Sequence, residues 1–130
     1  MSEPLKRTVA LRTVIVDKLA TAMPEGSKIY FQQAQSDHPK IYAVYTVDLI
    51  DLTDGRYTYE VEINVMDYGA DTTTLENLAD DIQAKFNKLV VINNYIGVYF
   101  YIEQRNSVEE EDRNVLRRRL TFSAYLYEGA

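Results

Sequence analysis

The sequence has no cysteine, no tryptophan and a single histidine among its 130 residues. Without cysteine, the chain has no disulfide framework, no thiolate zinc site and no cysteine nucleophile. No apolar run approaches the roughly 18 residues that a membrane-spanning helix needs. The N-terminal stretch MSEPLKRTVALRTV also lacks the unbroken apolar segment of a secretory signal. We therefore expect no association with a membrane.

Positive charge is also scarce, because 14 lysines and arginines face 20 aspartates and glutamates and leave a net charge of -6. Sequence-independent binding of nucleic acid usually needs a basic surface, so we do not expect it here. Tyrosine, in contrast, is plentiful, with 11 residues. Its apolar ring and polar hydroxyl suit protein interfaces. The length and the hydrophobic fraction of 46% predict one domain, residues 1–130, with its own core.

Hydrophobic periodicity predicts two helices, over residues 3–22 and 73–89. Alternating or apolar runs predict strands over 28–33, 41–52, 56–67, 95–103 and 115–127. The segment 104–114 is expected to be a charged loop. Because the helices do not alternate strictly with the strands, we predict an α+β fold. In this fold, two α-helices pack on one face of an antiparallel β-sheet with long hairpins.

The clearest alternation in the chain is LTDGRYTYEVEINV, residues 52–65. A two-residue turn at Asp54-Gly55 would place Glu60 and Glu62 on the apolar face of the preceding strand. A three-residue turn, Thr53-Asp54-Gly55, shifts the pairing by one residue and keeps that face apolar. We therefore predict the three-residue turn, with Gly55 in the left-handed conformation. The predicted pairs are Leu49 with Tyr59, Val47 with Val61, Tyr45 with Ile63, and Ala43 with Val65.

The same register predicts the composition of the opposite, outer face of the sheet. This face mixes acidic, apolar and tyrosine side chains with two arginines of the last strand: Tyr42, Val44, Asp48, Ile50, Glu60, Glu62, Met66, Arg117 and Arg119. One interpretation is a solvated face with scattered apolar residues. The other, which we favour, is a subunit interface. The sequence leaves open whether the arginines meet the carboxylates within one subunit or across two.

No motif in the chain predicts catalysis. In Ser36-Asp37-His38-Pro39 the three polar residues are neighbours in sequence, whereas a catalytic triad is built from separate elements. Asp80 and Asp81 point about 100° apart on a helix and do not converge on a metal. The acidic run Glu109, Glu110, Glu111 and Asp112 lacks the spacing of a calcium loop, and we interpret it as a partner-facing loop. We expect no catalytic, cofactor-binding or metal site.

The full order of elements nevertheless resembles a known family. The closest similarities are YEVEINVMDYG, which leads directly into TTTLENLADDIQAKFNKL, and the acidic EQRNSVEEEDRN before the last strand, VLRRRLTFSAYLYE. This layout resembles the tail terminator proteins of long-tailed bacteriophages and prophages, which are also called tail completion or head–tail joining proteins. The resemblance covers nearly the whole chain, but it rests on order and pattern rather than on a diagnostic motif.

The resemblance implies a structural virion protein and no enzyme. Such proteins form a ring, usually hexameric, on the end of the tail tube. The implied partners are further copies of the chain, the tail tube protein and the head connector protein. DNA would pass through the ring without being specifically bound. The implied location is the virion tail, after assembly in the cytoplasm of the host bacterium.

Two other interpretations remain at this point. The first is another phage component, such as a neck, baseplate or minor tail protein. The second belongs to a different class: a small α+β ligand-binding domain or enzyme, with Tyr45, Tyr57 and Tyr59 lining a cavity between helices and sheet. Core packing is the simpler explanation of these tyrosines.

Overall fold

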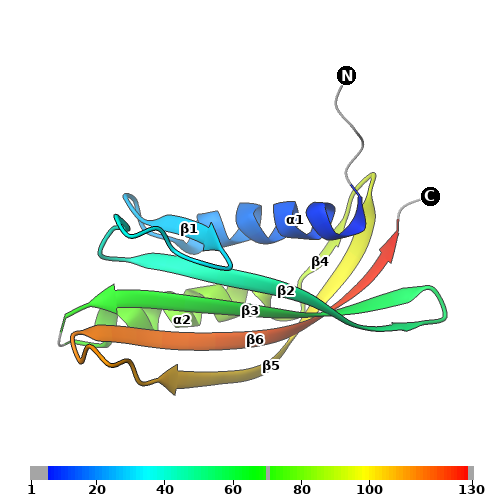
Figure 1. Cartoon of the computed structure of the whole chain (residues 1–130). Helices are drawn as coiled ribbons and strands as arrows, with labels where there is room; N and C mark the ends of the chain where they lie inside the picture. Colours follow the sequence, from blue (N-terminus) through cyan, green and yellow to red (C-terminus); the bar gives the residue numbers. More distant parts are fainter. Residues whose placement is uncertain (1–5, 70, 129–130) are drawn as a thin grey trace.

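A computed structural model of the chain describes residues 6–69 and 71–128. The elements, in chain order, are α1 (Arg7–Ala22), β1 (Lys28–Phe31), β2 (Tyr42–Thr53), β3 (Arg56–Tyr68), α2 (Thr73–Phe86), β4 (Val90–Ile92), β5 (Ile96–Val108) and β6 (Val115–Glu128). Two helices accompany one six-stranded sheet with the order β1-β2-β3-β6-β5-β4 (Figure 1). The predicted α+β fold is confirmed.

Every pairing in the sheet is antiparallel except that of β1 with β2. The parallel pair arises because residues 32–41 carry the chain back along the sheet before β2 begins. Sequence periodicity did not predict β4, since its three residues are too few to show an alternation. In the described residues, neither helix is long and apolar enough to cross a membrane.

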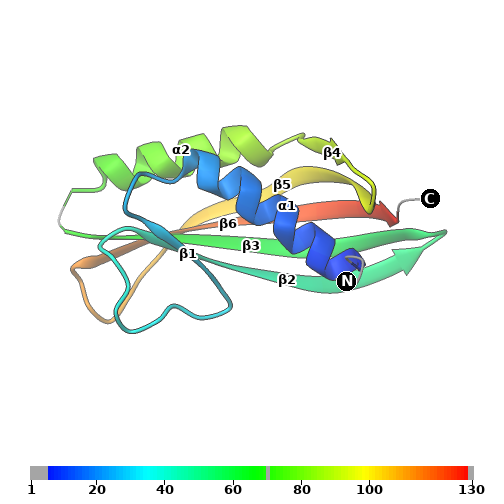
Figure 2. The ribbon, with the colours of Figure 1, turned by 90° about the horizontal axis from the view of Figure 1, so that it is seen from above.

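Both helices lie on the same side of the sheet, as predicted (Figure 2). Each presents a buried stripe at helical spacing, which in α1 includes Leu11, Ile15 and Leu19. These side chains join one hydrophobic core with the inward residues of β2, β3, β5 and β6. The outer face of the sheet carries no helix among the described residues.

The predicted hairpin register is correct, but the predicted turn is wrong. All four predicted pairs between β2 and β3 are present. However, Thr53 pairs with Arg56, so the turn contains only Asp54 and Gly55. Both have positive φ, 53° and 78°, as a two-residue hairpin turn requires. The extra residue is Ile50, where the register shifts in a β-bulge. The bulge and the longer turn produce the same pairs from Leu49 back to Ala43, but the bulge places Asp51 opposite Thr58 and Leu52 opposite Tyr57.

Several further boundaries differ from the prediction. The predicted helix 73–89 ends at Phe86, and the predicted strand 28–33 ends at Phe31. The predicted loop 104–114 is largely strand, because β5 continues to Val108 past a bulge between Ile102 and Gln104. Its polar side chains fit a strand because some of them bind across the sheet or to α2: Arg105 forms ion pairs with Glu76 and Asp80. The predicted helix 3–22 begins at Arg7 in the structure, and residues 3–5 lie outside the described ranges.

Candidate assembly surface

The outer face brings together the side chains predicted to lie there. Tyr42 pairs with Met66, and Met66 pairs in turn with Arg117. Nearer the turn, Asp48 pairs with Glu60. The predicted surface therefore crosses β2, β3 and β6, and it divides into two halves of different character. We call them the groove half, near the start of β2, and the hairpin half, near its end.

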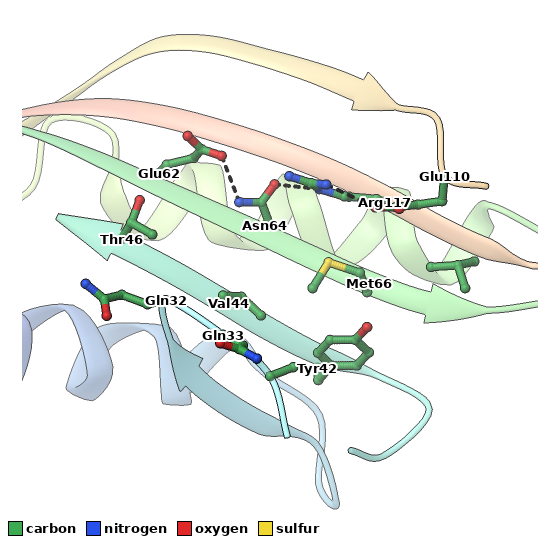
Figure 3. A pocket seen from close by; sticks show the side chains of 12 residues that line it. Gln32, Gln33, Tyr42, Val44, Thr46, Glu62, Asn64, Met66, Glu110 and Arg117 are labelled. Carbon is green, nitrogen blue, oxygen red and sulfur yellow. Dashed lines mark hydrogen bonds and ion pairs between the residues drawn. The ribbon is translucent and has the colours of Figure 1, made fainter. Parts of the chain in front are cut away.

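The groove half is a concave region of about 440 Å³ between the loop after β1 and the loop before β6 (Figure 3). Five of the predicted surface residues line it: Tyr42, Val44, Glu62, Met66 and Arg117. Gln32 and Gln33 form one wall and Glu110 stands at the other. The groove is open and mixes apolar with polar side chains, which fits a protein segment better than a small ligand.

A chain of hydrogen bonds crosses the floor of this groove (Figure 3). Asn64 donates through Nδ2 to Glu62 Oε1 at 3.0 Å and accepts at Oδ1 from Arg117 Nε at 2.8 Å. Arg117 Nη1 also forms an ion pair with Glu110 Oε1 at 3.0 Å. One of the two predicted arginines is therefore paired within its own chain, and with Glu110 rather than with Glu60 or Glu62.

Asn64 and Glu110 are the residues of this network that sequence reasoning did not place there. Asn64 is only 6% exposed, although it lies on the outer face. Its period-2 position was visible in the sequence, but its partner lies 53 residues away on β6. Only the β3–β6 pairing shows that the two side chains meet.

Tyr42 sits at one end of the groove and packs against His38, with ring centroids 4.0 Å apart and the rings tilted by 31°. Partial burial raises the pKa of the Tyr42 hydroxyl, and the nearby Glu110 carboxylate raises it further. His38 is exposed, and its Nδ1 lies 2.9 Å from the Pro39 carbonyl oxygen. The single histidine thus packs at the rim of the groove, and it contacts an aromatic ring rather than a nucleophile.

The hairpin half is much more exposed, and its charged side chains make fewer ion pairs and hydrogen bonds within the chain. Asp48 and Glu60 lie directly opposite each other. Neither carboxylate forms an ion pair with any residue in the described ranges. Ile50 is 56% exposed at the bulge. Arg119 does not reach these carboxylates, and its closest polar contact is a 3.4 Å hydrogen bond to Asn106.

Two carboxylates of the acidic loop, Glu110 and Asp112, are bound by other residues of the same chain. Glu110 binds Arg117, as described above. Asp112 accepts hydrogen bonds from the Asn114 N–H at 3.0 Å and from the Tyr68 hydroxyl at 2.9 Å. The Asn114 N–H lowers the pKa of Asp112, and the Tyr68 hydroxyl lowers it further. Glu109 and Glu111 are exposed, so these two are the loop carboxylates most available to a partner.

The tyrosines considered for a ligand cavity are packed instead. Tyr45 and Tyr59 are 2% and 1% exposed, and both belong to the hydrophobic core. The Tyr59 hydroxyl accepts from Arg7 Nε at 2.8 Å and lies 2.7 Å from Thr8 Oγ1. The Arg7 guanidinium covers the Tyr57 ring at 3.8 Å. Packing and hydrogen bonding within the chain therefore account for these three tyrosines.

Comparison with known proteins adds one line of evidence. No protein-family model matches the chain, and no curated protein matches it. Among solved structures, 25 chains match. One of them is a chain from the virion of a native gene transfer agent (GTA) particle, with a TM-score of 0.69 and 16% sequence identity. The similarity covers 88% of this chain and 92% of that chain. The two chains share a fold over nearly their whole lengths.

The described side chains of the outer face form a surface that another protein could contact. The described ranges hold no cluster of three or more histidine, aspartate or glutamate side chains placed to bind a metal ion. The polar groups of the outer face are either hydrogen-bonded to one another, as in the groove half, or exposed beside apolar side chains, as in the hairpin half. Exposed carboxylates beside exposed aliphatic residues suit contact with another protein.

Proposed function

We propose that this chain is a structural protein of a phage-like virion. The observation that carries the proposal is the fold shared with a chain of the GTA virion particle over 88% of this sequence. The exposed, unpaired hairpin half supports it, because a protein that works by assembly needs such a surface.

More narrowly, we propose the tail terminator role that the sequence pattern suggests. In this role, copies of the chain form a ring, hexameric as in the proteins it resembles, on the end of a tail tube. The ring contacts the tail tube protein on one side and the head connector protein on the other. A ring uses heterologous contacts, in which one surface of a subunit meets a different surface of the next. The predicted outer-face residues are the proposed subunit interface, and the acidic loop faces a partner.

The net charge of -6 bears on the passage of DNA. A negatively charged ring repels phosphates, so DNA would pass without being retained. An assembled ring with an arginine-lined lumen that held DNA at moderate salt would contradict this part of the proposal.

The test is to purify the chain and measure its mass in solution over a range of concentrations, followed by negative-stain imaging. We expect rings, either free or on the ends of tail tubes formed by the tube protein of the same particle. A chain that stays monomeric at all concentrations and does not bind tube ends would contradict the terminator role. Gold-labelled copies seen elsewhere in the particle would favour another neck, baseplate or minor tail component.

A further inference from the structure

Exposed apolar side chains gather on two opposite edges of the sheet. On β2, Leu49, Ile50 and Leu52 are 48%, 56% and 56% exposed, and we call them the hairpin strip. On β4, Val90 and Ile92 are 59% and 81% exposed, and we call them the edge strip. β4 is the last strand on its side, and β2 lies toward the other side (Figure 2).

The backbone at both strips is also incompletely paired within the described residues. β1 covers β2 only from Tyr42 to Tyr45, so Thr46–Thr53 has β3 on one side and no strand on the other. β4 pairs only with β5. Uncovered strand edges present N–H and C=O groups that invite another chain. Aliphatic side chains beside such an edge strengthen that tendency, because they gain by leaving water.

The charges around the two strips are opposite. Asp48, Asp51 and Asp54 surround the hairpin strip, and all three are exposed. Lys85 and Lys88 precede the edge strip and are also exposed. None of these five groups forms an ion pair with another residue that the structure describes.

We propose that the hairpin strip of one copy binds the edge strip of the next copy. This inference rests on the proposed self-assembly and names its contact. Charge decides between the arrangements of two copies. If two hairpin strips met, the aspartates of both copies would repel one another, and two edge strips would bring lysines together. Only the pairing of unlike strips joins carboxylates to ammonium groups and covers both apolar surfaces. Such a contact runs head to tail, as a ring requires.

The proposal also redistributes the predicted interface. Asp48 and Ile50 remain at the contact, and Glu60 lies beside Asp48 on the neighbouring strand. The groove half is then free for a different component, because its arginine and carboxylates are already satisfied within the chain. The partner surface on β4 was not predicted from the sequence at all.

The absence of native cysteine gives a direct test. The full chain is made as two variants, Leu52→Cys and Ile92→Cys, which are mixed and oxidised. A disulfide-linked band at twice the chain mass of 15.0 kDa is expected from the mixture. Neither variant alone should give this band, since like strips do not meet. A second pair, Thr53→Cys with Lys88→Cys, covers a small difference in register. The matched control is Leu52→Cys with Glu111→Cys, a distant exposed site.

The inference would be overturned if neither cysteine pair cross-links more than the control pair. The solution mass of the unmodified chain shows whether it still assembles. It therefore distinguishes failure of this inference from failure of the proposed function. Rings without a cross-link would mean that assembly uses other surfaces. A monomer that neither cross-links nor binds tube ends would overturn both proposals.

A second measurement uses Leu52→Asp and Ile92→Asp, each checked for native folding by circular dichroism. Each variant alone should lose self-association. Their mixture should give complexes of two chains and no larger species, because only one good pair of strips remains. Independent assembly of either variant to wild-type size would overturn the proposal.

Discussion

Asp48 and Glu60 lie directly opposite each other on neighbouring strands, and neither forms an ion pair with any residue in the described ranges. Like charges in such a pair destabilise a sheet slightly. An isolated copy therefore carries a small electrostatic cost on its outer face. A cation from a neighbouring chain would remove that cost, which connects the stability of one copy to its assembly.

Replacing Glu60 with glutamine is expected to have opposite effects on stability and on assembly. Removing the repulsion from Asp48 should raise the free energy of unfolding by about 0.2–1 kcal/mol, as measured by urea denaturation of the monomer. Self-association, measured by light scattering, should weaken, because Glu60→Gln reduces the negative charge beside the hairpin strip, which the proposed contact brings near the lysines of the next copy. The control is Glu111→Gln, which removes an exposed carboxylate that faces no other acid across the sheet. A loss of monomer stability in Glu60→Gln would show that the carboxylate has a favourable partner.

The groove network makes a different prediction for Arg117. Its guanidinium holds Asn64 through Nε and Glu110 through Nη1. Lysine has a single ammonium group and does not reproduce this forked geometry. We expect Arg117→Lys to cost about 1–2 kcal/mol of unfolding free energy, because the buried Asn64 amide loses an N–H donor.

The neighbouring Arg119 is the matched control for this measurement. It lies on the same face, and among the described residues its side chain makes one hydrogen bond, of 3.4 Å, to Asn106. Arg119→Lys should therefore change the stability very little. Equal effects of the two substitutions would mean that general charge, rather than the groove network, matters at these positions.

The hairpin illustrates how far sequence reasoning reached. Alternation along 56–67 identified the pairing of Leu49 with Tyr59, because a one-residue slip would move apolar side chains to the wrong face. Alternation did not identify the turn. A three-residue turn and a two-residue turn with a bulge give the same pairs from Leu49 back to Ala43, and they differ only in the residues between Leu49 and the turn.

The candidate surface shows the same division. Period-2 alternation placed Tyr42, Met66 and Arg117 on one face, and they do line one groove. The partner of Arg117 was not predictable, because Glu110 approaches from a loop whose path depends on how far β5 extends. The edge strip was missed for a related reason: three residues of β4 carry too little pattern to be seen as a strand.

The contact between Asp112 and Tyr68 should stabilise the fold only within a bounded pH range. Hydrogen bonds lower the pKa of Asp112 below its usual 3.8, so its contribution is complete above that pH and is lost as the pH falls through the lowered value. Asp112 raises the pKa of Tyr68 above its usual 10.0, so this contribution is lost as the pH rises through the raised value. Denaturant unfolding measured from about pH 2 to about pH 11 should show both losses.

Asp112→Asn should reduce the loss of stability at both low and high pH. The Asp112 carboxylate accepts the hydrogen bonds that are lost at low pH, and it also raises the pKa of Tyr68, which causes the loss at high pH. Glu111→Gln serves as the control, since it leaves the Tyr68–Asp112 hydrogen bond in place. An alkaline limb that is unchanged in Asp112→Asn would place its origin elsewhere, for example at Tyr57, whose pKa is raised by a hydrogen bond to Glu128.

Deletion of Ile50 tests whether the bulge, rather than a longer turn, sets the hairpin. Without Ile50, Leu49 opposite Tyr59 is followed directly by Asp51 opposite Thr58, and the ladder becomes regular. We expect the free energy of unfolding of the monomer to fall by at most about 0.5 kcal/mol, because the deleted side chain is largely exposed.

Deletion of Thr53 is the matched control. It also removes the bulge, but it moves Asp51 opposite Tyr57 on the helix face and should cost more. A three-residue turn in solution would reverse the order of the two variants, since the Thr53 deletion would then leave every pair unchanged. Cross-strand nuclear Overhauser contacts would report the register in each variant: Asp51 with Thr58 after deletion of Ile50, and Asp51 with Tyr57 after deletion of Thr53.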